Sequence, residues 1–240
     1  MKILRILSCL ILAPLFLGAT EIQSYELRLA TAPDGSGAAQ ATLRLTSCTP
    51  GQLKFPLGFI QIQELHLLEA PQGARLETGP TNGQMLLHAY LPEGLAPEAT
   101  LRFSFSIPQA FFVPEPGLGE KSNLPEGSRL FRHAFVNTQE GTIGSYRFEL
   151  LFPEHTMAQS IREQLPKAKK SEVGPRVLLT KLDGRQAAVL QLSTLKQGDD
   201  TSMLLEVVPE RKTWGWLLVG LALAAIYLVY FRDLVAPKKA

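Results

Sequence analysis

The chain has 240 residues, with 24 Lys and Arg against 22 Asp and Glu. All of the small basic excess comes from the first 19 and last nine residues, so residues 20–211 are close to neutral and lack the broad basic surface typical of nucleic-acid binding. Cys48 is the one cysteine after residue 19, which excludes an intramolecular disulfide in that region.

Residues 1–19 have the form of a secretory signal peptide. Lys2 and Arg5 give a positively charged start, and residues 6–17 are apolar but too few to cross a bilayer. Small residues follow, and we expect cleavage after Ala19. The sequence therefore predicts that the region from residue 20 onward is exported.

Residues 20–211 are predicted to be all-β. Residues 100–107 (TLRFSFSI) and 146–152 (YRFELLF) alternate apolar and polar side chains, as strands with one buried face do. The alternation changes phase near Gln63 or Glu64, which predicts a β-bulge, and Asp183-Gly184 predicts a two-residue hairpin turn. We expect about ten strands in an immunoglobulin- or fibronectin-like β-sandwich, formed as one large or two small domains.

One stretch in this region is predicted to be a short helix. In residues 155–165 (HTMAQSIREQL), Met157 and Ile161 stand four apart, Thr156 and Gln159 form a capping box, and Pro166 ends the run. We expect this helix to pack on the edge of the sandwich.

Residues 108–130 are rich in proline and glycine and form the predicted boundary if the region divides into two domains. We expect a partner-contact surface here, made by Phe111, Phe112, Pro114 and Pro116. The alternative is that the Phe-Phe pair packs back into the core.

Residues 213–231 (TWGWLLVGLALAAIYLVYF) carry no charge and are predicted to form a transmembrane helix, with Trp214 and Trp216 at one end and Tyr227 and Tyr230 at the other as membrane anchors. Residues 232–240 would be a short cytoplasmic tail. Together with the signal peptide, this predicts a single-pass protein of the bacterial inner membrane, with residues 20–211 in the periplasm or outside the cell.

The residue pattern offers little chemistry. The four histidines are far apart in sequence, aspartate is scarce, and no G-x-S-x-G motif occurs. We therefore expect no catalytic residue, no cofactor and no metal site.

These features favour a non-catalytic, membrane-anchored interaction module, or an accessory subunit of an envelope complex, with a membrane protein as partner. Two other functions stay open. One is a module that binds carbohydrate or an envelope polymer through exposed aromatic rings, such as Tyr90 beside Phe111 or Phe112. The other is a hydrolase whose residues converge only in the fold, and a homo-oligomer is also left open.

Overall fold

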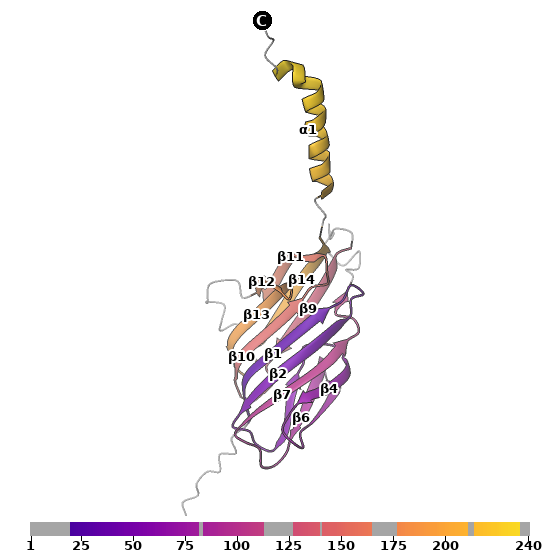
Figure 1. The fold of residues 1–240 in the computed structure, drawn as a ribbon. Helices are drawn as coiled ribbons and strands as arrows, with labels where there is room; N and C mark the ends of the chain where they lie inside the picture. Colours follow the sequence, from indigo (N-terminus) through magenta and orange to yellow (C-terminus); the bar gives the residue numbers. More distant parts are fainter. Residues whose placement is uncertain are drawn as a thin grey trace, which may run out of the picture.

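The computed structural model describes residues 20–81, 84–112, 127–139, 141–164, 177–210 and 214–235. Over these ranges the chain is mostly β-strand, which confirms the all-β prediction, and the strands form three sheets (Figure 1). The largest has seven strands in the order β12 (Val177–Leu182), β13 (Arg185–Leu195), β10 (Ile143–Leu151), β1 (Glu21–Thr31), β2 (Gly37–Thr46), β7 (Glu98–Ile107) and β4 (Gln63–Glu69).

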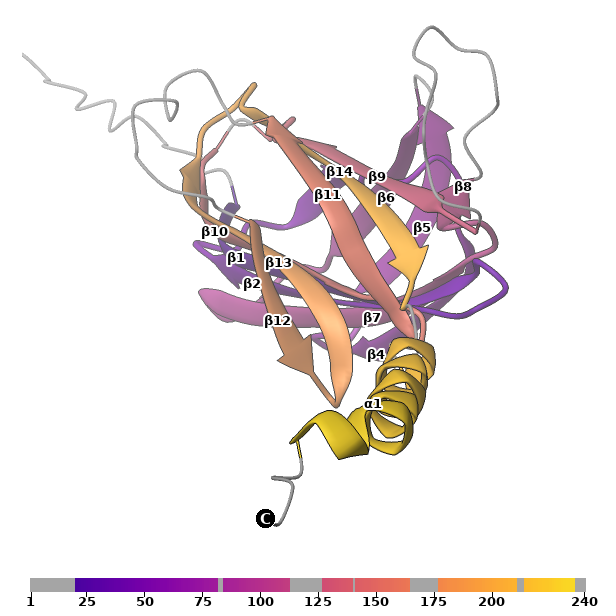
Figure 2. The same cartoon turned by 90° about the horizontal axis from the view of Figure 1, so that it is seen from above.

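Two smaller sheets lie across from the large one, as the view from above shows (Figure 2). The four-stranded sheet has the order β11 (Thr156–Gln164), β14 (Asp200–Pro209), β9 (Arg129–Val136) and β8 (Phe111–Phe112). The three-stranded sheet has the order β3 (Gly51–Pro56), β6 (Gln84–Leu91) and β5 (Arg75–Thr81).

A row of buried side chains explains why the central strands of the large sheet align as they do. The direct partners Leu192, Tyr146, Tyr25, Leu43 and Leu101 come from β13, β10, β1, β2 and β7, and all are almost completely buried. A slip of one residue in any of these strands would turn its apolar side chains to water, so burial fixes the register. The β1–β10 pair is parallel and the others are antiparallel.

Aromatic rings join the large sheet to both smaller ones. The ring of Tyr25 on β1 lies 4.5 Å from that of Phe55 on β3 and 5.8 Å from that of Phe135 on β9. Phe148 on β10 stacks with Phe131 on β9 at 5.9 Å. Edge-to-face and offset contacts of this kind stabilise a core beyond the area they bury. Strands from both sides of residues 108–130 therefore share one core.

Two local predictions are confirmed. Asp183 and Gly184 both have positive φ, 51° and 76°, as a type I′ hairpin turn between β12 and β13 requires. The register of β4 against β7 shifts between Gln63 and His66, and Glu64 has a φ of 52°, so the predicted bulge lies there.

The predicted helix over residues 155–165 is wrong, because Thr156–Gln164 form strand β11. This strand pairs antiparallel with β14, with Ile161 opposite Leu205. The register of β11 against β14 shifts between Ala158 and Ser160, so Met157 is exposed while Ile161 packs against the core. The bulge hides the strand alternation, and the four-residue spacing that remains is typical of a helix.

The prediction of a single-pass membrane protein is also wrong. Helix α1 (Trp214–Val235) lies beyond one end of the strands in Figure 1, and in the part of the chain that the structure describes no helix is long and apolar enough to cross a membrane.

The inner-membrane location and the topology inferred from this segment are withdrawn with it. So is the anchor role given to Trp214, Trp216, Tyr227 and Tyr230, since it depended on a membrane span. Helix α1 also continues to Val235, into the predicted tail. Residues 1–19, predicted as a signal peptide, lie outside the described residues.

Candidate functional site

A hollow of about 610 Å³ opens beside β9, and we name it the β9 groove. Three segments line it. They are the loop after β3 (Gly58, Phe59, Ile60 and Gln61), the end of β7 with its continuation into β8 (Ile107, Pro108, Gln109, Ala110 and Phe112), and Arg132 and Ala134 of β9. Its volume lies in the range of ligand-binding pockets, and most of its walls are apolar.

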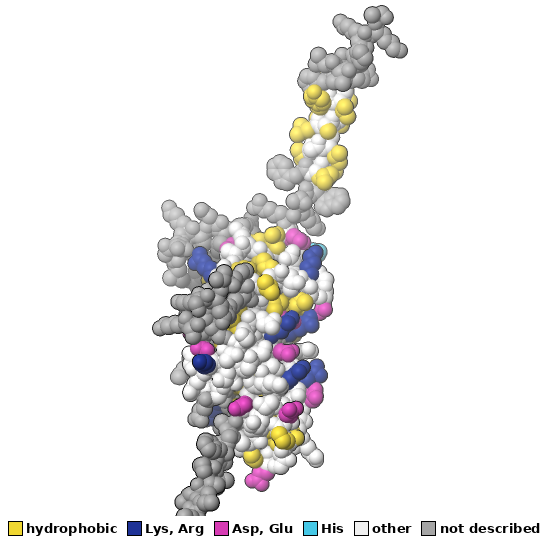
Figure 3. All heavy atoms as spheres, turned by 90° about the vertical axis from the view of Figure 1, so that its left-hand side faces the viewer, with side chains coloured by type: hydrophobic (Ala, Val, Ile, Leu, Met, Phe, Trp, Pro, Cys, Tyr) yellow, Lys and Arg dark blue, Asp and Glu magenta, His cyan; other side chains and the backbone are white. Residues whose placement is uncertain are grey.

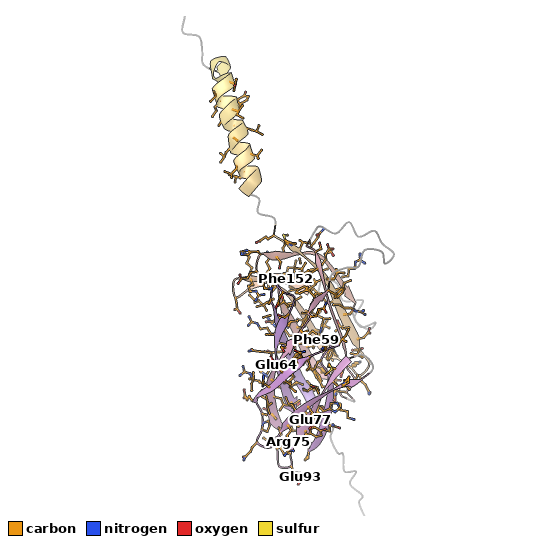
Figure 4. All side chains as sticks on the ribbon, turned by 90° about the vertical axis from the view of Figure 1, so that its right-hand side faces the viewer. Phe59, Glu64, Arg75, Glu77, Glu93 and Phe152 are labelled. Carbon is orange, nitrogen blue, oxygen red and sulfur yellow. The ribbon has the colours of Figure 1, made fainter. Side chains whose placement is uncertain are left out.

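Backbone hydrogen bonds to β6 fix the loop after β3. The N–H of Leu57 donates to the carbonyl of Met85 at 3.0 Å, and the N–H of Met85 donates to the carbonyl of Phe59 at 2.8 Å. The ring of Phe59 lies between those of Phe105, at 5.9 Å, and His133, at 5.2 Å. Phe59 is labelled near the middle of the body in Figure 4. One wall of the groove is therefore held by the core.

The opposite wall comes from the predicted Phe-Phe contact. The N–H of Ala110 donates to the carbonyl of Gly35 at 2.8 Å, which holds the chain beside β9. Phe111 is buried against Phe131, with ring centroids 5.7 Å apart, so it packs in the core. Phe112 is 39 % exposed and lines the groove. Pro114 and Pro116, the other two predicted contact residues, lie outside the described residues.

Ile60 is the groove residue that sequence analysis missed. Its side chain is 81 % exposed, the highest value among the large hydrophobic residues whose exposure the structure gives. The alternation around residues 58–68 predicts a strand containing Ile60 and Ile62, but β3 ends at Pro56 and β4 begins at Gln63. An apolar side chain left in water beside an apolar hollow is typical of a contact surface.

A buried histidine lies behind the groove. His133 on β9 is fully buried, stacks on Phe148 at 4.1 Å, and its Nε2 is 2.6 Å from the hydroxyl of Tyr146. Burial lowers the pKa of His133 to about 3, and the backbone of Gly58 only partly opposes this shift. The ring is therefore neutral, and its Nε2 shares a hydrogen bond with the hydroxyl of Tyr146.

The tyrosines beside His133 share this desolvated environment. Burial raises the pKa of Tyr25 and that of Tyr146. The neighbouring Tyr25 raises the pKa of Tyr146 further. The hydroxyl of Tyr25 and Nδ1 of His133 are buried without a hydrogen-bond partner of good geometry among the described residues. All three side chains are enclosed by the core, so we assign them to packing.

Tyr90, the aromatic residue predicted for carbohydrate binding, lies on a different sheet from Phe112. It is on the outer face of the three-stranded sheet, where its hydroxyl is 2.9 Å from Nε2 of Gln52 and 3.3 Å from Glu77, a residue visible in Figure 4. Gln52 also contacts His88 at 2.9 Å. The structure therefore does not bring Tyr90 together with Phe111 and Phe112.

A second hollow, of about 690 Å³, lies on the outer face of the seven-stranded sheet. Arg44 and Arg102 line it together with Glu26, Glu69 and Glu98, and Arg102 pairs with Glu69 at 3.3 Å. Its charges are mixed in sign, so it selects neither anions nor cations. No cluster of three His, Cys, Asp or Glu side chains suited to a metal ion occurs within the described ranges.

Exposed apolar side chains also occur on two edge strands, β11 of the four-stranded sheet and β12 of the seven-stranded sheet. In Figure 3 hydrophobic atoms spread over the upper part of the face, with charged side chains beside them. Met157 on β11 and Leu178 and Leu179 on β12 are 41 %, 57 % and 48 % exposed. None of these three side chains lines the β9 groove or the second hollow.

Comparisons with known proteins give no family. No family model matches the chain, and no curated protein does. Among solved structures, a provisionally assigned nutrient-binding protein of Legionella pneumophila aligns over 78 % of this chain and 66 % of its own, at 12 % identity and a TM-score of 0.45.

Two further solved structures are similar at the same level. Yeast LTA4 hydrolase aligns over 77 % of this chain and 29 % of its own, at 8 % identity and a TM-score of 0.44. An M1 zinc metallopeptidase of Deinococcus radiodurans aligns over 78 % and 42 %, at 14 % identity and a TM-score of 0.40. The chain spans less than two thirds of each protein, and likeness this weak carries no argument.

Replacing Gly58 with alanine is expected to destabilise the protein by about 1–3 kcal/mol. Gly58 has a φ of 77°, and a Cβ there would lie 2.4 Å from Cε1 of His133 and 2.9 Å from the carbonyl oxygen of Ala134. Urea denaturation measures the loss. Gly94→Ala is the matched control, because Gly94 has the same φ of 77° and nothing within 4 Å. Equal losses in the two variants would contradict the close contact.

His133 is expected to make the protein sensitive to mild acid. Its folded-state pKa, about 3, lies below the ordinary value of 6.5, so the unfolded chain binds the proton first and stability falls as pH drops through this window. Between pH 7 and pH 5 the free energy of unfolding should fall by about 2 kcal/mol.

Chemical denaturation at the two pH values measures this loss. His133→Gln should remove most of it, while His66→Gln, at an exposed position on β4, should keep it. An unchanged loss in His133→Gln would show that another group is responsible.

Proposed function

We propose that this chain is a non-catalytic interaction module that binds a partner protein through the β9 groove. The observation that carries the proposal is the pair of exposed apolar side chains at the rim, Ile60 and Phe112, above an apolar hollow whose walls are held by the core. Covering such side chains removes apolar surface from water, which is the main driving force of protein association.

The rigidity of both walls supports the same function. Hydrogen bonds to Met85 position one wall, and a hydrogen bond from Ala110 to Gly35 positions the other. A preformed groove loses little conformational freedom on binding, so more of the burial energy remains as affinity. The role as an accessory subunit of a larger complex follows from this proposal, with the partner supplying any chemistry.

For the architecture we propose a β-sandwich, in which the seven-stranded sheet faces the two smaller sheets. Its support is the set of aromatic contacts from Tyr25 to Phe55 and Phe135, which join strands of different sheets. The parallel pairing of β1 with β10 differs from the antiparallel sheets of an immunoglobulin domain. The sandwich is therefore proposed without the immunoglobulin or fibronectin topology.

Carbohydrate binding is a second candidate, favoured by Tyr90. Its ring is 37 % exposed, and its hydroxyl is held by Gln52 and Glu77, so a flat apolar surface lies among hydrogen-bonding groups. Sugars stack on such rings. Binding of soluble glycans by the wild-type chain and not by Tyr90→Ala would favour this function over the groove.

Ile60→Asp and Phe112→Asp are each expected to abolish partner capture, because a carboxylate would have to be buried in an apolar contact. The tagged full chain is purified from the cells that produce it, and the proteins that co-purify with it are identified by mass spectrometry. Leu68→Asp is the control, since Leu68 is 54 % exposed on β4 and does not line the groove. If the two groove variants retain the co-purifying proteins as well as Leu68→Asp does, the proposal is overturned.

A further inference from the structure

The orientation of the β9 backbone can be derived from its end. The N–H of Asn137 donates to the carbonyl of Asp199 at 2.9 Å, and the N–H of Gly198 donates to the carbonyl of Asn137 at 2.8 Å. Both backbone groups of Asn137 therefore face the β14 side. Successive residues of an antiparallel strand direct these groups to opposite edges, and the β9–β14 register runs without a shift.

Counting back along β9 gives the edge that faces the groove. The backbone groups of Phe135, His133 and Phe131 bond to β14, so those of Ala134 and Arg132 face the other edge. Both of these residues line the β9 groove. The groove is thus formed over part of a strand edge.

This edge is covered at both ends and open between them. Phe112 of β8 pairs with Leu130, and at the other end the Gly58 backbone approaches the carbonyl oxygen of Ala134. The pairing of Phe111 with Phe131 directs the N–H of Arg132 at the carbonyl of Ala110. In the described part of the chain, the C=O of Arg132 and the N–H of Ala134 are therefore the groups of this edge without a backbone partner. The open section spans about two residues, or about 7 Å.

The side chain of Arg132 adds a charge to the groove. It is exposed and forms no ion pair with any residue that the structure describes. A guanidinium presents several N–H donors in a plane and suits a carboxylate. Open backbone groups, apolar walls and one unpaired cation therefore occur together.

We propose that the β9 groove takes a short extended peptide segment of a partner, which adds to the edge of β9 at Arg132 and Ala134. Backbone hydrogen bonds hold the segment, an apolar side chain packs between Ile60 and Phe112, and an acidic side chain or terminal carboxylate meets Arg132. Strand addition of this kind obtains affinity from the main chain and specificity from alternate side chains. The inference rests on the proposed function and specifies its ligand.

A library of random twelve-residue peptides displayed on phage is the probe, selected against the purified full chain. Enriched peptides are then synthesised and titrated by fluorescence anisotropy. We expect alternating apolar residues with an Asp or Glu. Ala134→Pro removes the N–H that faces the groove and leaves the bonds to β14 intact, so it should weaken binding about tenfold or more.

Arg132→Glu is the second variant, at an exposed position where folding is not at risk. This variant should bind acidic peptides about tenfold more weakly than wild type does. It should bind peptides with Lys in place of the acidic residue more tightly. The inference is overturned if no peptide is enriched, if enriched peptides bind both variants as well as wild type, or if the purified chain dimerises through this face instead.

The variants also distinguish a failure of strand addition from a failure of the proposed function. If Ile60→Asp abolishes partner capture while Ala134→Pro and Arg132→Glu do not affect it, the groove binds a folded surface and strand addition is wrong. If Ile60→Asp and Phe112→Asp also leave capture unchanged, the proposed function itself is wrong.

Discussion

The close approach of the Gly58 backbone to β9 is the constraint on which the groove depends. Without a side chain, Gly58 can lie against the ring of His133 and the carbonyl oxygen of Ala134, and its φ of 77° turns the chain away again toward Ile60. Any larger residue would have to move the loop outward. The exposure of Ile60 and the closed end of the β9 edge both follow from this contact.

The core behind the groove explains how this contact is maintained. His133 is stacked on Phe148, bonded to Tyr146 and covered by Phe59, so the surface that Gly58 meets cannot easily move. A neutral, desolvated histidine gives this rigidity at the expense of acid tolerance, since protonation would require burying a charge. Stability of the fold and shape of the groove are therefore coupled at His133.

Some of the fold could be predicted from the sequence because it depends on neighbouring residues. Strict alternation gave strands β7 and β10, and Asp183-Gly184 and the phase change near Glu64 gave a turn and a bulge. β11 was missed because a bulge between Ala158 and Ser160 hides its alternation, and the membrane prediction took an apolar run for a span. Local patterns alone could not decide either case.

The groove was less accessible to sequence reasoning. Phe112 was predicted as a contact residue and lines it, but Phe111 packs in the core and Ile60 looked like a strand residue with a buried face. Arg132 and Ala134 have no local signature, because an open edge depends on which strands lie on either side of β9. That information exists only once strand order is known, and strand order cannot be read from alternation.

The most direct test is amide hydrogen exchange of the free protein, followed residue by residue by NMR. The account predicts that the amides of Phe131, His133 and Phe135, bonded to β14, exchange at least about a hundredfold more slowly than that of Ala134. Equal protection of all four amides would mean that the edge is already paired and that the groove has no free strand edge.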